Sequence, residues 1–273
     1  MDLLLLFKAA IMGLVEGITE FLPISSTGHL ILSGQLLEFW TVEKRDMFAV
    51  AVQIGAIAAV IYQYWGKLWG ALIGALTGQE QGRRLSINLI VASIPIVIVG
   101  LTFGETVKAY LFNAVTVAIA LIIGGFIILW AERRQHQIIS PEVDDLTFKQ
   151  ATLIGLIQCF ALIPGTSRSG STIIGSLFLG VSRKAAAEFS FFLGIPVLMG
   201  AGLLDMYKMR HELHSNDMLV LAVGIIVAFI SALVVIRALI RYVSKHDFTA
   251  FAYYRIVFGV LILLTWWTGW VHW

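Results

Sequence analysis

Apolar runs long enough to cross a membrane recur along this 273-residue chain, and they constrain its fold more than any other feature. An α-helix rises 1.5 Å per residue, so about 20 apolar residues span the roughly 30 Å hydrocarbon core of a bilayer. Six stretches reach or approach that length, near 47–65, 87–103, 115–131, 189–204, 218–236 and 250–270. Because hydrocarbon offers no water to backbone polar groups, we predict that these stretches are transmembrane helices.

The composition excludes a soluble domain. Hydrophobic residues make up 59% of the chain and charged residues only 13%, against about 25% charged residues in ordinary soluble domains. We therefore expect an all-α integral membrane protein with one membrane domain, residues 1–273, and short loops. The formal charge of +2 gives no support for nucleic-acid binding. A further apolar stretch, 68–76, is too short to span and is expected to lie along a surface.

Two other apolar regions, 3–37 and 151–181, are interrupted by proline, glycine, hydroxyl and charged residues. Such breaks end a helix, and non-helical backbone at membrane depth is tolerated only inside protein or beside a wet cavity. Each region therefore predicts a broken helical hairpin that enters the membrane and turns back. The breaks read Pro23-Ile-Ser-Ser-Thr-Gly-His29 and Pro164-Gly-Thr-Ser-Arg-Ser-Gly-Ser-Thr172.

The two broken regions align with each other at an offset of 141 residues, which indicates a duplication. The matching pairs are Phe7-Lys8 with Phe148-Lys149, Pro23 with Pro164, Ser26 with Ser167, and Phe48 with Phe189. Each half, about 1–132 and about 148–273, then holds one re-entrant hairpin followed by three transmembrane helices. Because three is odd, the second half starts on the opposite side of the membrane, which predicts an inverted repeat.

The basic residues predict the orientation of the chain. In this scheme Arg83-Arg84, Arg133-Arg134 and the group Arg237, Arg241 and Lys245 share one side, which an excess of Lys and Arg marks as cytoplasmic. The loops 38–46, 104–114 and 205–217 then lie outside, although the first of them also holds Lys44 and Arg45.

The first break gathers acid, base and hydroxyl groups. Glu16 and Glu20 are four residues apart, so on a helix both carboxylates project from one face toward Ser26 and His29. Carboxylates in hydrocarbon are costly and usually face a wet cavity or a partner. The alternative is an interfacial helix with solvated carboxylates. A lone histidine is more often structural than catalytic, but two carboxylates and two hydroxyls nearby favour a catalytic group.

The second break offers a site for an anion. The planar guanidinium of Arg168 suits phosphate oxygens, and Ser167, Ser169 and Thr172 add hydroxyl donors. The start of the following helix contributes to the same positive field. The alternative is a helix cap of Ser and Thr, with Arg168 extending to lipid headgroups. The Gly-Lys-Ser/Thr of a Walker loop is absent, so nucleotide binding has no support.

The motif Glu16-Gly-Ile-Thr-Glu-Phe-Leu-Pro-Ile-Ser-Ser-Thr-Gly-His29, together with the second break, resembles the undecaprenyl-diphosphate phosphatases of the bacitracin-resistance type. The segments Gln53-Ile-Gly, Ala187-Glu-Phe-Ser-Phe and Tyr254-Arg255 are also similar to that family, so the resemblance covers nearly the whole chain. It implies hydrolysis of undecaprenyl diphosphate to undecaprenyl phosphate and inorganic phosphate. That reaction recycles the lipid carrier of cell-wall synthesis at the outer face of the bacterial plasma membrane.

Both breaks together supply what hydrolysis of a membrane-bound diphosphate requires. Arg168 and the hydroxyls, with Ser25 and Thr27 added, are expected to hold the phosphates, while either His29 or Ser26 attacks the terminal phosphorus. Glu16 and Glu20 orient a base, activate water or bind a divalent cation, Mg²⁺ or Ca²⁺. The residues do not decide between the two nucleophiles, and they leave a homodimer open. The rival function is a polyprenyl-phosphate transporter or flippase, because inverted repeats with broken helices are a transporter architecture.

Overall fold

The computed structural model describes residues 3–134, 137–208 and 217–270, and over these residues the chain is helical, with one isolated bridge between Ser140 and Val181. Six helices are long and apolar enough to cross a membrane, and each contains most or all of one predicted span. They are α3 (Val42–Gln63), α5 (Glu80–Leu111), α6 (Ala114–Arg133), α9 (Arg183–Lys208), α10 (Met218–Val243) and α11 (Thr249–Trp267). The prediction of a polytopic α-helical membrane protein is confirmed.

Both broken regions are helices interrupted where the sequence predicts. The first consists of α1 (Leu3–Thr19) and α2 (Ser26–Leu36), and the second of α7 (Phe148–Gln158), a 3₁₀ turn (Cys159–Leu162) and α8 (Arg168–Phe178). The two limbs of each region pack against each other, α1 on α2 and α7 on α8. The residues between the limbs, 20–25 and 163–167, together with the first turn of the helix that follows each of them, form the two tips.

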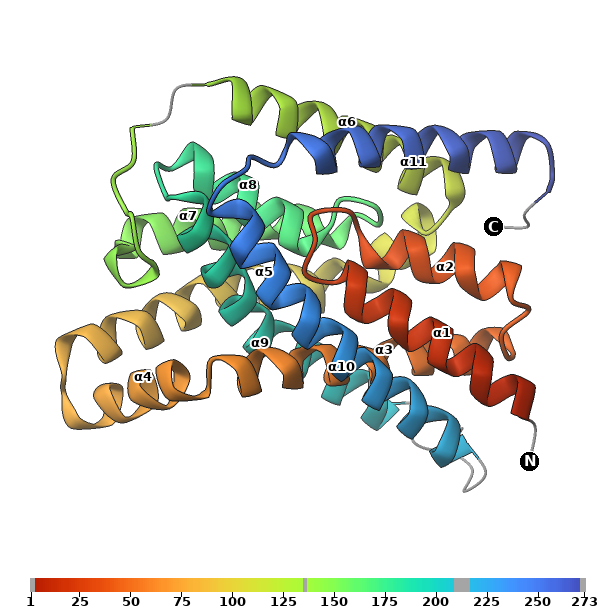
Figure 1. Ribbon diagram of the computed structural model, residues 1–273, viewed down its shortest axis with the longest axis horizontal. Coiled ribbons are helices and arrows are strands. Elements are labelled where there is room, and N and C mark those ends of the chain that lie inside the picture. The colour runs from red at the N-terminus through yellow and green to blue at the C-terminus, as the bar shows by residue number, and fades with distance from the viewer. Residues whose placement is uncertain (1–2, 135–136, 209–216, 271–273) are drawn as a thin grey trace.

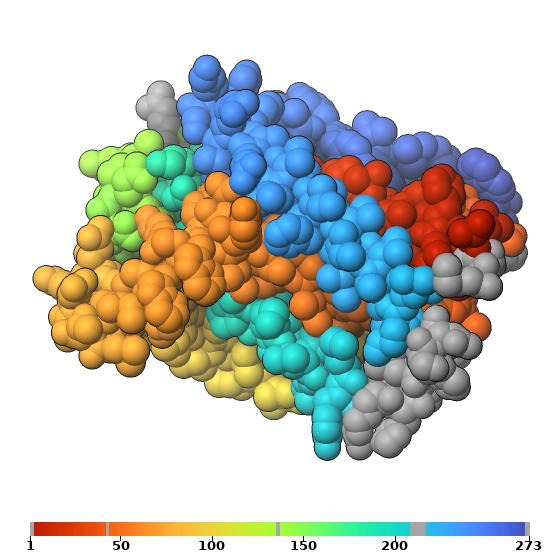
Figure 2. Space-filling view, turned by 60° about the horizontal axis from the view of Figure 1, so that its bottom comes forward, coloured from red at the N-terminus to blue at the C-terminus, as the bar shows by residue number. Residues whose placement is uncertain are grey.

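The apolar stretch 68–76 lies in a short helix, α4 (Trp65–Thr77), that packs along the first turns of α5. These two helices form an arm at one end of the molecule (Figure 1), seen in orange tones in the space-filling view (Figure 2). The stacked rings of Trp65 and Trp69 are more than half exposed on this arm. A helix with exposed tryptophans on one face suits a position along a surface.

Helix packing follows the same pattern in the two halves of the chain. Helix α1 packs on α10, and its counterpart α7 packs on α5. Small residues allow both contacts: a Cβ on Gly13 would lie 2.4 Å from the carbonyl oxygen of Gly224, and one on Gly155 would lie 2.5 Å from that of Ala92. Close approach at small residues is a usual means of helix association in membranes.

The remaining long helices surround the two tips. Helix α3 contacts both α9 and α10, while α6 and α11 lie side by side along one edge of the molecule (Figure 1). Phe21 of the first tip is fully buried, and its ring meets the ring of Phe191 of α9 edge-on at 5.3 Å. The core therefore encloses the polar breaks, as it must if irregular backbone lies at membrane depth.

Candidate active site

The two tips share a local backbone feature that fixes where their helices begin. Ser25 and Ser167 have φ of 70° and 73°, a left-handed conformation that is uncommon for residues other than glycine, and each directly precedes its helix. Structurally, therefore, Ser25 matches Ser167 at an offset of 142. The predicted pairing of Ser26 with Ser167 is one residue out at the tips, because the second tip holds one more residue between its proline and this serine.

The tips of the two breaks are in direct contact. Nη2 of Arg168 donates to Oε1 of Glu20 at 2.9 Å, and the two side chains are only 8% and 6% exposed. The Ser169 hydroxyl donates to the carbonyl oxygen of Leu22 at 2.8 Å. A carboxylate from one half of the chain and an arginine from the other thus form one buried group, 148 residues apart in sequence.

Helix α9 completes the surroundings of Arg168. Nη1 of Arg168 donates to the carbonyl oxygen of Ser190 at 2.6 Å, and the Thr172 hydroxyl donates to the Ser190 hydroxyl at 2.7 Å. A Cβ on Gly194 would lie 3.0 Å from the guanidinium carbon, so this glycine leaves room for the arginine. Ser190 was not predicted as a site residue, although it lies in the segment Ala187-Glu-Phe-Ser-Phe that is similar to the family.

The Ser167 hydroxyl bonds within the second tip. The Ser167 side chain caps α8 by accepting from the Gly170 amide at 3.0 Å, and it lies 3.1 Å from the Ser169 hydroxyl. The helix-cap interpretation of this cluster is therefore correct for Ser167. The alternative in which Arg168 extends to lipid headgroups is wrong, because its guanidinium is buried against Glu20 and Ser190.

In the first tip, Ser26 and Glu20 are joined by a short hydrogen bond. The Ser26 hydroxyl donates to Oε2 of Glu20 at 2.6 Å, so both oxygens of this carboxylate are bonded, one to a hydroxyl and one to Arg168. Ser26 and Glu20 are buried, and Thr27 beside them is partly buried. An acceptor held this close to a hydroxyl can take its proton.

His29 is held at both ring nitrogens. Nδ1 lies 2.7 Å from the carbonyl oxygen of Ser25, which can only accept, so Nδ1 carries the proton. Nε2 lies 2.6 Å from the Tyr254 hydroxyl and accepts from it. The imidazole also stacks on Phe258 with ring centroids 4.1 Å apart. Tyr254 and Phe258 belong to α11, so the last helix of the chain sets the orientation of the histidine.

Glu16 lies one helical turn before Glu20 and is fully buried, and neither of its carboxylate oxygens has a hydrogen-bond partner among the described residues. Nε of Arg168 is likewise buried without a partner there. The alternative of solvated, interfacial carboxylates is wrong for Glu16 and Glu20. Unpaired polar atoms at such depth are costly and mark where a polar ligand would be stabilised.

The described residues contain no group of three or more His, Cys, Asp and Glu side chains that could hold a metal ion. The pair Glu16 and Glu20 therefore does not make a complete protein cage. Mg²⁺, however, is commonly bound through one or two carboxylates together with substrate phosphates. The unpartnered oxygens of Glu16 fit that mode of binding.

One arginine near the tips was not predicted as a site residue. Arg255 of α11 is fully buried and donates to backbone carbonyls of both tips and of α6. A charged residue inside an apolar span is a signal for function, and that signal was present in 250–270.

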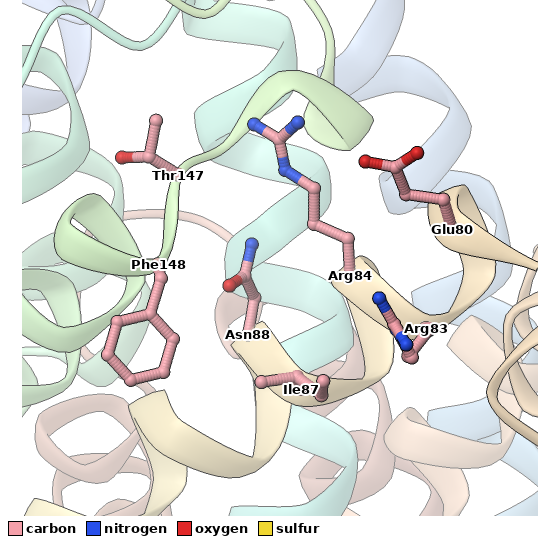
Figure 3. A pocket seen from close by; sticks show the side chains of 7 residues that line it. All are labelled: Glu80, Arg83, Arg84, Ile87, Asn88, Thr147 and Phe148. Atoms are coloured by element: carbon pink, nitrogen blue, oxygen red, sulfur yellow. The ribbon is translucent and has the colours of Figure 1, made fainter. Parts of the chain in front are cut away.

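Two cavities are lined by described residues, and one of them adjoins the second tip. An apolar cavity of about 600 Å³ is lined mainly by residues of α6 and α8, and its polar lining includes Thr166, Ser171 and Arg255. A smaller pocket between the start of α5 and α7 is lined by Glu80, Arg83, Arg84, Ile87, Asn88, Thr147 and Phe148 (Figure 3). None of the predicted site residues lines either cavity.

Comparison with known proteins identifies the family. The family model described as "Bacitracin resistance protein BacA" matches residues 9–261. The chain belongs to the BacA family. It is 65% identical to "Undecaprenyl-diphosphatase 1" of Acinetobacter baylyi, over all of both chains. It is 58% identical to "Undecaprenyl-diphosphatase 2" of Rhodospirillum rubrum over 100% of this chain and 99% of that protein. The residues matched by the BacA model include both tips, and they also include Tyr254 and Arg255 of α11.

Proposed function

We propose that this BacA-family protein hydrolyses undecaprenyl diphosphate to undecaprenyl phosphate and inorganic phosphate. The names of its full-length relatives support the reaction, and the resistance named for the family fits recycling of the lipid carrier for peptidoglycan synthesis. The main structural support for this reaction is that the Glu20 carboxylate accepts two hydrogen bonds, one from the Ser26 hydroxyl and one from Arg168. A candidate nucleophile, its base and an anion-binding arginine thereby form one group. A flippase would have no use for that group.

In the proposed mechanism Ser26 is the nucleophile. Glu20 takes the hydroxyl proton while Oγ attacks the terminal phosphorus, and the bond from that phosphorus to the bridging oxygen breaks. Undecaprenyl phosphate leaves, and a phosphoserine remains. Water then attacks the phosphoserine phosphorus, inorganic phosphate leaves, and Ser26 regains a proton. His29 is the second candidate nucleophile, but its Nε2 lone pair is engaged by Tyr254. We assign His29 to proton transfer instead.

Arg168 and the tip backbone stabilise the charge that develops on the transferred phosphoryl group. A buried guanidinium stabilises this charge more strongly than an exposed one, because the protein interior screens the interaction less than water does. Ser167, Ser169, Thr172, Ser25 and Thr27 are proposed to complete the phosphate site. The hydroxyls that bond within the second tip would have to exchange those bonds for bonds to phosphate.

Trapping of the covalent intermediate tests the nucleophile. When purified protein in detergent is mixed with undecaprenyl diphosphate labelled in its terminal phosphate and quenched within milliseconds, we expect label on Ser26, stable to acid. Ser26→Ala should abolish the label, whereas Tyr254→Phe should keep it. Label that is lost in acid but stable in base would place the phosphoryl group on His29 instead, and absence of any label from active protein would favour direct attack by water.

A divalent cation would be held by Glu16 and Glu20 together with oxygens of the diphosphate. When bound, such a cation would neutralise charge on the phosphates. Glu16→Gln keeps the shape of the side chain and removes a buried charge that has no protein partner, so we expect the unfolding temperature to stay the same or rise. Turnover at saturating Mg²⁺ or Ca²⁺ should fall about tenfold to a hundredfold, and half-maximal activity should require more cation. Unchanged cation dependence would remove Glu16 from a metal site.

The packing pattern supports an inverted repeat. If α1, α3, α5 and α6 correspond to α7, α9, α10 and α11, then the contact of α1 with α10 is the counterpart of that of α7 with α5. We infer that the two broken regions are re-entrant hairpins entering from opposite faces and meeting at mid-depth. The basic residues at the start of α5, the end of α6 and the end of α10 support a cytoplasmic location for those ends. The site then opens to the outer face of a bacterial plasma membrane. Association of two copies into a homodimer remains open to test.

A further inference from the structure

Helix α11 places an arginine between the two tips, and no carboxylate of the described residues pairs with it. Arg255 is 1% exposed, and its side chain is the largest fully buried one among the described residues. Its five hydrogen bonds all end on backbone carbonyl oxygens. The acceptors are Pro23 at 3.1 Å, Thr166 at 2.9 Å, Gly165 at 3.1 Å, Ala120 at 3.1 Å and Leu121 at 3.2 Å.

These acceptors come from three separate segments, and one nitrogen joins the two tips directly. Nη1 of Arg255 donates both to Pro23 in the first tip and to Thr166 in the second. Nη2 joins Gly165 of the second tip to Ala120 of α6, and Nε bonds Leu121 of the same helix. A planar guanidinium with five donors in a fixed fork can make this connection, whereas an ammonium group cannot.

The bonded carbonyls lie next to the unusual backbone of the tips. Pro23 is two residues before Ser25, and Thr166 directly precedes Ser167. Left-handed backbone at a non-glycine residue persists only where the surroundings determine it strongly. The bonds from Arg255 are part of what holds these two serines, and hence the starts of α2 and α8, in place.

We propose that Arg255 is a positioning residue, which fixes the first tip against the second and so sets Glu20 and Ser26 at the right distance from Arg168. This inference rests on the proposed site, in which the two tips act on one diphosphate. Arg255 acts only through the carbonyls that it binds. Glycines make room for it: a Cβ on Gly124 would lie 2.2 Å from Nη2, and one on Gly170 would lie 3.0 Å from Nη1.

Arg255→Lys is the first test, because it keeps the charge and loses the connection. Each tip keeps its own groups and only their relative placement changes, so kcat should fall about a hundredfold while KM changes less than about threefold. Arg237→Lys is the matched control, since that arginine is exposed and donates to Gln63. A kcat per folded molecule equal to that of the control would overturn the proposal.

Gly124→Ala is the second test. If Arg255→Lys fails to fold, the kcat of Gly124→Ala tests the proposal by itself. The added Cβ displaces the guanidinium while Arg255 itself remains, so the same selective fall in kcat is expected. Gly104→Ala is its control, because nothing lies within 4 Å of a Cβ at that position. If Gly124→Ala and Gly104→Ala have the same kcat, the position of the Arg255 guanidinium does not matter for turnover and the proposal fails.

A readout that needs no hydrolysis separates this proposal from the proposed function. Cysteines at Thr27 and Ser171, with Cys159 replaced by alanine, should be joined by a short bifunctional reagent, and Arg255→Lys should lower the yield severalfold. An unchanged yield overturns the positioning role. A lower yield with unchanged kcat would overturn the shared site as well as the positioning role, because the tips would have moved without consequence for turnover.

Discussion

Arg168→Lys is expected to lower kcat/KM about a thousandfold, although the charge is kept. The guanidinium reaches Glu20 and the Ser190 carbonyl through two different nitrogens, and Nε is left for a ligand. An ammonium group is a single point with a shorter reach, so it cannot hold Glu20 and a phosphate together. The guanidinium also lies so close to Gly194 that a Cβ there would be 3.0 Å from its carbon.

Release of inorganic phosphate from undecaprenyl diphosphate in detergent measures this effect. Arg183→Lys is the matched control, because that arginine is paired with Glu132 and is 42% exposed. It should stay within about twofold of wild type, because lysine keeps the charge opposite Glu132 and the pair lies outside the tips. If Arg168→Lys retains activity within about threefold of this control, Arg168 does not bind the transferred phosphoryl group.

Glu20→Gln should lower kcat by about a thousandfold, because an amide cannot take the Ser26 proton. Unlike Glu16→Gln, this change should also destabilise the protein. It leaves the buried charge of Arg168 without its partner, and breaking one side of a buried ion pair costs about 3–5 kcal/mol. Kinetics should therefore be measured on folded monodisperse protein, with thermal unfolding followed in parallel.

Glu132→Gln is the control for the loss of stability alone. Glu132 is the buried partner of Arg183, at the end of α6 and outside the tips. It should lower the unfolding temperature without a comparable loss of kcat per folded molecule. Should Glu20→Gln and Glu132→Gln lower kcat to the same extent, Glu20 would be a structural carboxylate and another group would have to serve as the base.

The sequence predicted the helices because hydrophobicity in lipid is a local property that each segment carries in its own residues. The ends of the helices were harder to predict. Helix α5 begins at Glu80, ahead of the predicted start at 87, because its polar first turns pack on α4. The packing is close there, since a Cβ on Gly74 would lie 2.9 Å from the Cα of Gly82. Tertiary contact there extends a helix beyond its apolar stretch.

The site was predictable only where its residues are neighbours in sequence. Glu20 and Ser26 could be paired from their spacing, and the charge of Arg168 called for a partner. Ser190 and Tyr254 come from helices that meet the tips only in the folded chain. The left-handed serines were not predictable either, since serine has no intrinsic preference for that conformation. Their backbone is determined by neighbours such as Arg255.

A double-mutant cycle on Glu20 and Arg168 tests most directly the claim that the two tips form one catalytic site. The kcat/KM values of wild type, Glu20→Gln, Arg168→Lys and the double variant are compared on folded protein in detergent. Residues that act as a unit are strongly non-additive, so the double variant should be only about as impaired as the worse single variant, roughly a thousandfold. Multiplication of the two single effects, to about a millionfold, would show that the groups act independently and would contradict a shared site.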